Sequence, residues 1–83
     1  MYLHLGQKQV VTTKEIIGIF DLDTATVSAR TRDFLRRAEG AGKVISVSQE
    51  LPKSFILCEN GNVYLSQISP ATLLARLEKS SRR

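Results

Sequence analysis

Alternating apolar and polar residues at the start of the chain predict a β-hairpin. Residues 1–5 place Leu3 and Leu5 on one side of a strand, which is the period-2 pattern of a half-buried strand. Residues 6–7 include a glycine and are expected to form the turn. Residues 8–12, centred on two valines, would then return as the second strand.

The longest apolar run lies at residues 15–22 and leads into the most basic helical segment of the chain. The run is rich in β-branched and aromatic side chains and has few charges, so we expect a central strand that is covered on both faces. Gly18 within the run indicates a β-bulge or a close approach of another group to the backbone. The rest of the chain is expected to be organised around this strand.

A helix is predicted next, because apolar residues recur with a helical period. Asp23 or Thr24 can cap its start by accepting a backbone hydrogen bond. The Gly-Ala-Gly segment at 40–42 ends it, since glycine tolerates the left-handed backbone found just after helices. Its apolar face consists of Val27, Phe34, Leu35 and Ala38. Its other faces carry Arg30, Arg32, Arg36 and Arg37.

The second half of the chain predicts three more strands. A short strand at 43–47 is followed by a hairpin whose strands cover 54–59 and 62–66. Asn60 and Gly61 join these two strands and favour a type I′ turn, which requires positive φ at both positions.

The last helix is predicted to start at Pro70, because proline fits the first helical position and Ser69 can cap it. Its apolar stripe consists of Leu73, Leu74 and Leu77. We expect one domain over residues 1–79 and a flexible basic tail at 80–83. The order β-β-β-α-β-β-β-α is typical of an α+β domain with a small, mostly antiparallel sheet and two helices.

Size and composition indicate a folded protein that associates with itself. The chain has 83 residues, 42% of them hydrophobic and 24% charged. A domain this small buries only about 60% of its unfolded surface, and two helices leave part of the sheet uncovered, so we expect a homo-oligomer. No apolar run approaches the roughly 18 residues of a membrane span, and the start does not resemble a signal peptide. We therefore expect a soluble, cytoplasmic protein.

Residues suited to catalysis or metal binding are scarce. His4 is the only histidine, and Cys58 is the only cysteine and lies within an apolar run. Metal sites need several ligands, and a reactive thiolate is favoured by basic neighbours. We therefore expect no enzyme activity, no metal or cofactor and no small-molecule substrate.

Positive charge is the main functional signal from composition. The formal net charge is +4, and the excess lies in residues 24–43 and 70–83, which suits a polyanion. The helix arginines could contact phosphates, or they could form a solvated face partly neutralised by Asp33 and Glu39. A helix-turn-helix does not fit, because this helix lies between strands.

The chain resembles the bacterial RemA/RemB family of extracellular matrix regulators over nearly its whole length. Four stretches carry the resemblance: Glu15-Ile-Ile-Gly-Ile-Phe-Asp-Leu-Asp23, Thr31-Arg-Asp-Phe-Leu35, Leu51-Pro-Lys-Ser-Phe55 and Val63-Tyr-Leu-Ser-Gln-Ile-Ser-Pro-Ala-Thr-Leu73.

The resemblance implies a DNA-binding regulator of extracellular matrix and biofilm genes, acting at the nucleoid, whose small subunits assemble into a ring. The family's DNA-contacting arginines lie just before the central strand and in the loop that leads into the final hairpin. Here these places hold Lys14 and Lys53, beside Glu15 and Glu50. The two lysines are the candidate DNA contacts, and the weaker candidates are Arg30, Arg32, Arg36 and Arg37. The alternative is an oligomeric protein-interaction module that modulates a partner regulator without binding DNA.

Overall fold

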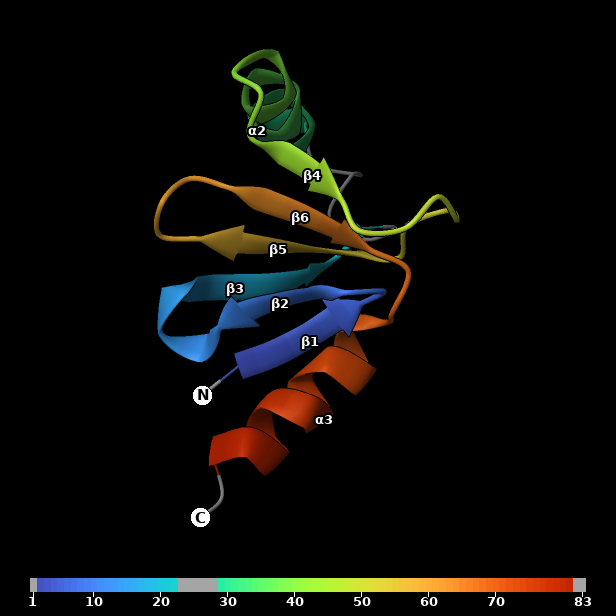
Figure 1. The fold of residues 1–83 in the computed structure, drawn as a ribbon. Coiled ribbons are helices and arrows are strands. Elements are labelled where there is room, and N and C mark those ends of the chain that lie inside the picture. Colours follow the sequence, from blue (N-terminus) through green and yellow to red (C-terminus); the bar gives the residue numbers. More distant parts are fainter. Residues whose placement is uncertain (1, 23–28, 82–83) are drawn as a thin grey trace.

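The computed structural model describes residues 2–22 and 29–81 and has an α+β architecture (Figure 1). Its elements are β1 (Tyr2–Gly6), β2 (Gln9–Thr12), the 3-10 helix η1 (Thr13–Glu15), β3 (Ile16–Asp21), α2 (Ala29–Gly40), β4 (Val44–Ser46), β5 (Ser54–Cys58), β6 (Val63–Ser66) and α3 (Pro70–Ser81). The predicted fold class and the order of strands and helices are confirmed. α3 continues through Ser81, two residues into the segment expected as a tail.

The strands form two sheets. A four-stranded sheet has the order β3-β5-β6-β4, and β1 and β2 form a separate two-stranded hairpin. β5 pairs antiparallel with both β3 and β6, while β4 runs parallel to β6. Strand pairing is therefore mostly antiparallel, as predicted, with a single parallel pair at one edge of the larger sheet.

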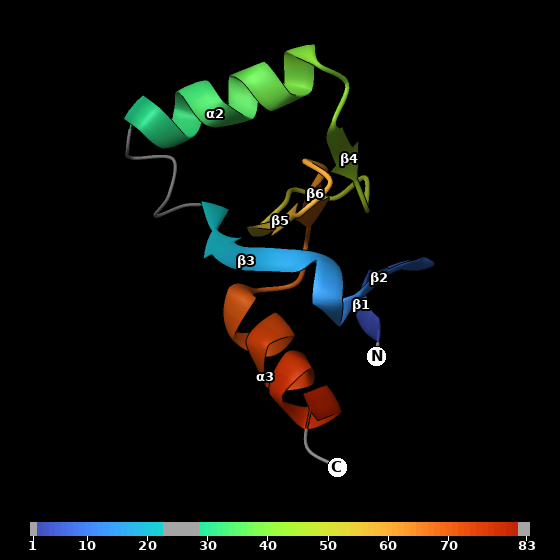
Figure 2. The same cartoon turned by 90° about the vertical axis from the view of Figure 1, so that its left-hand side faces the viewer.

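β5 and β6 supply two apolar layers, because successive strand residues point to opposite faces of a sheet. Ile56 and Tyr64 belong to a cluster that includes residues of β1, β2 and α3. Phe55 and Val63 pack in a second cluster with Ala38 of α2. α2 lies on one side of the sheet, and the β1–β2 hairpin and α3 lie on the other side (Figures 1 and 2).

The prediction of a central strand at 15–22 is wrong. β3 is an edge strand of the larger sheet, and Ile17 and Phe20 are 60% and 40% exposed. The short β5–β6 connection makes those two strands neighbours, so β5 has β6 on one side and β3 on the other. An apolar run therefore marked a strand with partly covered faces, and gave no information about its place in the sheet order.

Both features expected at Gly18 are present, a β-bulge and a close approach of another group to the backbone. The register between β3 and β5 shifts between Ile16 and Gly18. A Cβ added at Gly18 would also lie 2.6 Å from the Cζ atom of Phe20, closer than real Cβ contacts allow. The Phe20 ring therefore lies over Gly18, and it stacks on Phe55 with ring centroids 4.9 Å apart.

The hairpin at 54–66 is confirmed, but its turn is not type I′. Gly61 has a φ of 90°, and Asn60 is not among the residues with positive φ. The Asn60 side chain instead accepts a 3.0 Å hydrogen bond from the Asn62 backbone N–H, and Gly61 N–H donates to the Cys58 carbonyl. A side-chain hydrogen bond thus stabilises a turn in which one residue alone needs the left-handed backbone.

Helix α3 starts as predicted. The backbone N–H of Thr72 donates to Ser69 Oγ at 3.3 Å, and Pro70 occupies the first position of the helix. The predicted caps of the other helix, Asp23 and Thr24, lie outside the described residues, as does Val27. At its other end, Gly42 has a φ of +73°, which fits the glycine signal for helix termination.

Two buried serines connect the sheet to the elements on its α3 side. Ser66 Oγ donates a 2.7 Å hydrogen bond to the Leu5 carbonyl and accepts one from the Ile68 N–H at 3.0 Å. Ser54 pairs with Ser66 across the strands and donates to the Ile68 carbonyl at 2.8 Å. Both serines are 0% exposed, and their hydroxyls satisfy one backbone group of the buried Leu5 and two of the half-buried Ile68.

Replacing Ser66 with alanine should lower the free energy of unfolding by about 1–3 kcal/mol, because it leaves the Leu5 carbonyl and the Ile68 N–H without their partner. Urea unfolding followed by circular dichroism measures this loss. The exposed Ser46 on β4 is the control, and its alanine variant should stay within about 0.5 kcal/mol of the wild type. Equal effects of the two substitutions would contradict the role given to Ser66.

Candidate nucleic-acid interface

Lys14 lies in η1, where the chain turns from the β1–β2 hairpin into the larger sheet. Its side chain is exposed. The backbone around it is fixed, because the carbonyl of the next residue, Glu15, accepts a 2.7 Å hydrogen bond from the Glu59 N–H. Lys14 is therefore held at the end of the sheet where β3 begins and β5 finishes.

Lys53 lies immediately before β5, and its backbone is anchored on both sides. Its N–H donates to the Ser66 carbonyl at 2.8 Å, and its carbonyl accepts from the Leu22 N–H at 3.0 Å. The side chain is exposed. Lys53 thus projects from a rigid position at the end of the sheet where β5 begins and β6 finishes.

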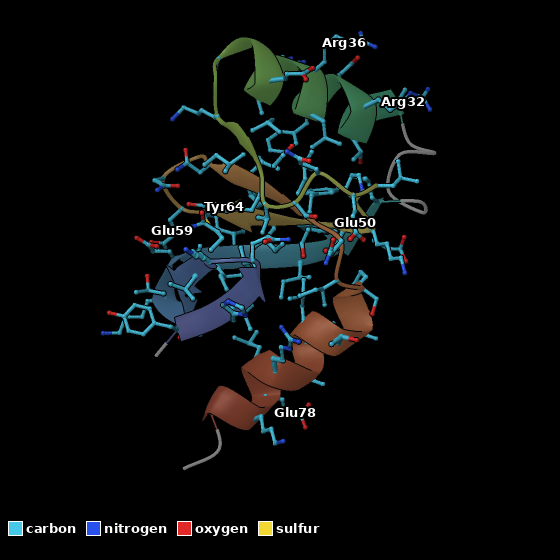
Figure 3. All side chains as sticks on the ribbon, turned by 45° about the vertical axis from the view of Figure 1, so that its right-hand side comes forward. Arg32, Arg36, Glu50, Glu59, Tyr64 and Glu78 are labelled. Carbon is cyan, nitrogen blue, oxygen red and sulfur yellow. The ribbon has the colours of Figure 1, made fainter. Side chains whose placement is uncertain are left out.

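The structure does not bring the two lysines together within one chain. β3 and β5 are antiparallel, with Ile16 opposite Cys58 and Asp21 opposite Ser54. Lys14 and Lys53 therefore lie at opposite ends of this pair, roughly 15–20 Å apart at the rise per residue of a strand. Glu59 and Glu50 mark the same two ends in Figure 3. A single copy presents two separate positive positions.

An open groove of about 1170 Å³ lies between the β1–β2 turn and the loop that leads to Lys53. The groove is lined by Gln7, Lys8, Gln9, Ser46, Val47, Ser48, Gln49, Glu50, Leu51, Pro52 and Leu65. Ser48 braces its loop side by donating to Gln67 at 2.7 Å and accepting from the Glu50 N–H at 3.1 Å. The sequence reading missed Lys8, because its place across the groove from this loop depends on the tertiary fold.

The helix arginines form a second positive surface, on α2. Arg30, Arg32, Arg36 and Arg37 are all exposed, and Arg32 and Arg36 project outward from α2 in Figure 3. Arg36 lies 3.6 Å from Asp33 in an exposed pair on the same helix, an arrangement that contributes little to stability.

Comparison with known proteins identifies the family of this chain. The model of the RemA-like family, described as "Extracellular matrix regulatory protein A-like", matches residues 2–77. The chain belongs to the RemA-like family. It is 37% identical over 78 residues to "Extracellular matrix regulatory protein B" of Bacillus subtilis, covering 94% of this chain and 91% of that protein. It is also 30% identical over 79 residues to a putative regulatory protein of Coprothermobacter proteolyticus, covering 94% and 71% of the two chains.

The resemblance inferred from the sequence is thereby confirmed, since family membership extends over nearly the whole chain. The family model includes Lys14, Lys53 and the four helix arginines in its matched range. Their assignment as DNA contacts stays a prediction.

The single histidine and the single cysteine of this RemA-like protein make contacts within the fold. His4 Nε2 lies 2.8 Å from the Gln7 carbonyl oxygen. Burial and, to a smaller extent, the nearby Glu15 carboxylate raise the pKa of the Cys58 thiol. Within residues 2–22 and 29–81, no group of three His, Cys, Asp or Glu side chains could hold a metal ion. None of the described helices is long and apolar enough to cross a membrane.

Cys58 should react with iodoacetamide at least about a hundredfold more slowly in the folded protein than in urea, because it is buried and its thiol stays protonated at neutral pH. Mass spectrometry of samples quenched over time follows the alkylation. Similar rates in both states would contradict a purely structural role for this cysteine.

Proposed function

We propose that this protein is a non-enzymatic, oligomeric regulator that binds duplex DNA through its phosphate backbone and controls extracellular matrix or biofilm genes. The regulatory role is supported by its membership of the RemA-like family and by its similarity to extracellular matrix regulatory protein B of Bacillus subtilis. The proposed site of action is the nucleoid in the cytoplasm.

The observation that supports DNA contact is that the two lysine side chains are exposed and form no ion pair with the described residues. Lys14 and Lys53 are exposed, and neither forms an ion pair within the described part of the chain. A lysine ammonium is a compact point charge that can neutralise a phosphate without reading a base. Both side chains extend from backbone positions fixed by hydrogen bonds, so little order must be imposed on the chain when they bind.

One copy alone supplies a weak site. Glu15 follows Lys14 directly and Glu50 lies three residues before Lys53, so each lysine has a carboxylate nearby that repels phosphate. Repetition of the same two lysines around a ring or along an array adds contacts without changing any of them. The effective concentration of each further contact is then set by the assembly, and total affinity rises steeply.

The affinity for a DNA duplex should fall as salt is added. The logarithm of the binding constant should decrease linearly with the logarithm of the salt concentration, with a slope of about −0.9 per phosphate neutralised. Lys53→Glu should reduce both the affinity and this slope, because each subunit in contact loses a positive partner for phosphate. Fluorescence anisotropy with a labelled duplex measures both quantities. Lys79→Glu changes an exposed lysine on α3 and is the matched control. Equal losses from the two reversals would place the DNA contact elsewhere.

A second candidate function is an oligomeric protein-interaction module. Phe20 and Phe34 support it, because they are 40% and 38% exposed and line one pocket together, and exposed apolar side chains gathered in one place mark interaction surfaces. Light scattering with and without duplex at low salt separates the two functions. An oligomer that gains no mass from the duplex would favour the module, whereas a complex of higher mass supports DNA binding.

A further inference from the structure

An open cavity lies where β1 and α3 run beside each other (Figure 1). It has a volume of about 350 Å³ and is lined by Tyr2, Leu3, His4, Arg76 and Lys79. We call it the β1–α3 cavity. Its volume falls within the range of about 300–1,000 Å³ that is usual for small-molecule sites. It includes neither candidate DNA lysine, and it shares no lining residue with the groove beside the 46–52 segment.

Arg76 is held in a defined orientation at this cavity. The Nη1 atom of its guanidinium donates a 3.2 Å hydrogen bond to the His4 carbonyl oxygen, which ties the helix side chain to the strand. Arg76 makes no other hydrogen bond or ion pair with the described residues. The N–H groups on Nε and Nη2 are therefore unused. They form one edge of a rigid fork that matches two oxygens of a phosphate or carboxylate.

The β1–α3 cavity carries positive charge with no carboxylate among its lining residues. Lys79 lies three residues after Arg76 and therefore on the same side of α3. It is exposed and forms no ion pair with the described residues. Glu78 lies about 200° around the helix from Arg76 and about 100° from Lys79, so it belongs to another face. Two permanent cations thus line one cavity.

A purely structural role explains only part of this arrangement. A cation in the last turn stabilises a helix through the helix dipole, and this accounts for Lys79. It does not account for Arg76, which lies in the middle of α3 and bonds to a neighbouring strand. The two cations together, one of them oriented, are what an anion site requires.

Tyr2 adds an aromatic ring beside these charges. It is 66% exposed, whereas the next residue, Leu3, is buried in the core. An exposed ring near cations suits a ligand that combines a planar ring with a phosphate, because nucleic-acid bases stack on aromatic side chains. The bases of a duplex are already stacked on their neighbours, so such a ring selects an unstacked base.

We propose that the β1–α3 cavity binds a free nucleotide, with the phosphate on Arg76 and Lys79 and the base on the ring of Tyr2. A phosphate monoester carries a charge of about −1.5 to −2 at neutral pH, which two cations match. The Nε and Nη2 edge of Arg76 receives two phosphate oxygens, and Lys79 neutralises the remaining charge. The site uses neither Lys14 nor Lys53, so it does not depend on the proposed DNA contact.

Titration of the ¹⁵N-labelled protein with adenosine monophosphate (AMP), followed by NMR, tests the site. We expect saturable shifts of the backbone amides of Tyr2, His4, Arg76 and Lys79. Inorganic phosphate lacks the base and should bind at least about fivefold more weakly. Adenosine lacks the charged group and should bind at least about tenfold more weakly. Absence of saturable shifts with AMP would overturn the proposal, and equal affinities for AMP and phosphate would overturn the assignment to a nucleotide.

Substitutions test the three contacts separately. Arg76→Lys keeps the charge but loses the fork, and Lys79→Gln loses a charge, so each should lower the affinity for AMP at least about threefold. Tyr2→Ser should lower it at least about fivefold, while Tyr2→Phe keeps the ring and should stay within about twofold of the wild type. Arg37→Gln removes an exposed arginine on α2 and is the matched control.

Circular dichroism and thermal unfolding confirm that each variant is folded. Lys79 makes no hydrogen bond or ion pair with the described residues, so Lys79→Gln tests the charge even if Arg76→Lys loosens β1. Unchanged AMP affinity in folded Lys79→Gln or in folded Tyr2→Ser would overturn the site.

The same variants separate a free nucleotide from nucleic acid as the source of the phosphate. Tyr2→Ser and Lys79→Gln should leave the affinity for a labelled duplex within about twofold of the wild type. Equal losses of duplex and AMP affinity would assign the phosphate to DNA and overturn the nucleotide site. A single-stranded oligonucleotide that binds more tightly than AMP through Tyr2 and Lys79 would overturn it too. Failure of the wild type to bind duplex at low salt would refute the proposed function and leave this site standing.

Discussion

Burial of the β5–β6 hairpin from both sides is the constraint on which the rest of this structure depends. Ile56 and Val63 are completely buried in different clusters, so the hairpin needs one cover on each face. The β1–β2 hairpin and α3 provide one cover and are fastened by the hydroxyls of Ser54 and Ser66. α2 covers the other face less completely, and the partly exposed phenylalanines lie on that side. The unequal covers leave apolar side chains partly exposed beside α2.

The sequence predicted those parts of the fold that depend on local chemistry. Alternation and turn residues located the strands, and Ser69 with Pro70 located the start of α3. The order of strands within the sheet could not be predicted, because it depends on which strands pair. The same limit explains the error at residues 15–22, whose apolar pattern fits an edge strand beneath a partial cover as well as a central one. The turn at Asn60 was also misassigned, since a side-chain hydrogen bond replaced the expected backbone conformation.

The candidate site was harder to infer. Counts of charge draw attention to α2, where four arginines are exposed, whereas the resemblance to a family selected Lys14 and Lys53. Neither route indicated that these lysines lie at opposite ends of one sheet, because that follows from the antiparallel register of β3 and β5. Lys8 was missed for the same reason, as its position across the groove from the 46–52 segment is set by tertiary packing.

The two-sided burial of β5 also limits how the separation of the lysines can vary. β5 acts as a spacer between the ends that carry them. Insertion of one residue would move every β5 side chain beyond it to the opposite apolar layer, whereas insertion of two residues preserves the layers and lengthens the spacer by about 7 Å. The distance between positive charges can therefore change only in steps of roughly two base pairs of B-DNA. Under the proposed function, the core that stabilises the fold would also set the increments in which these charges match a duplex.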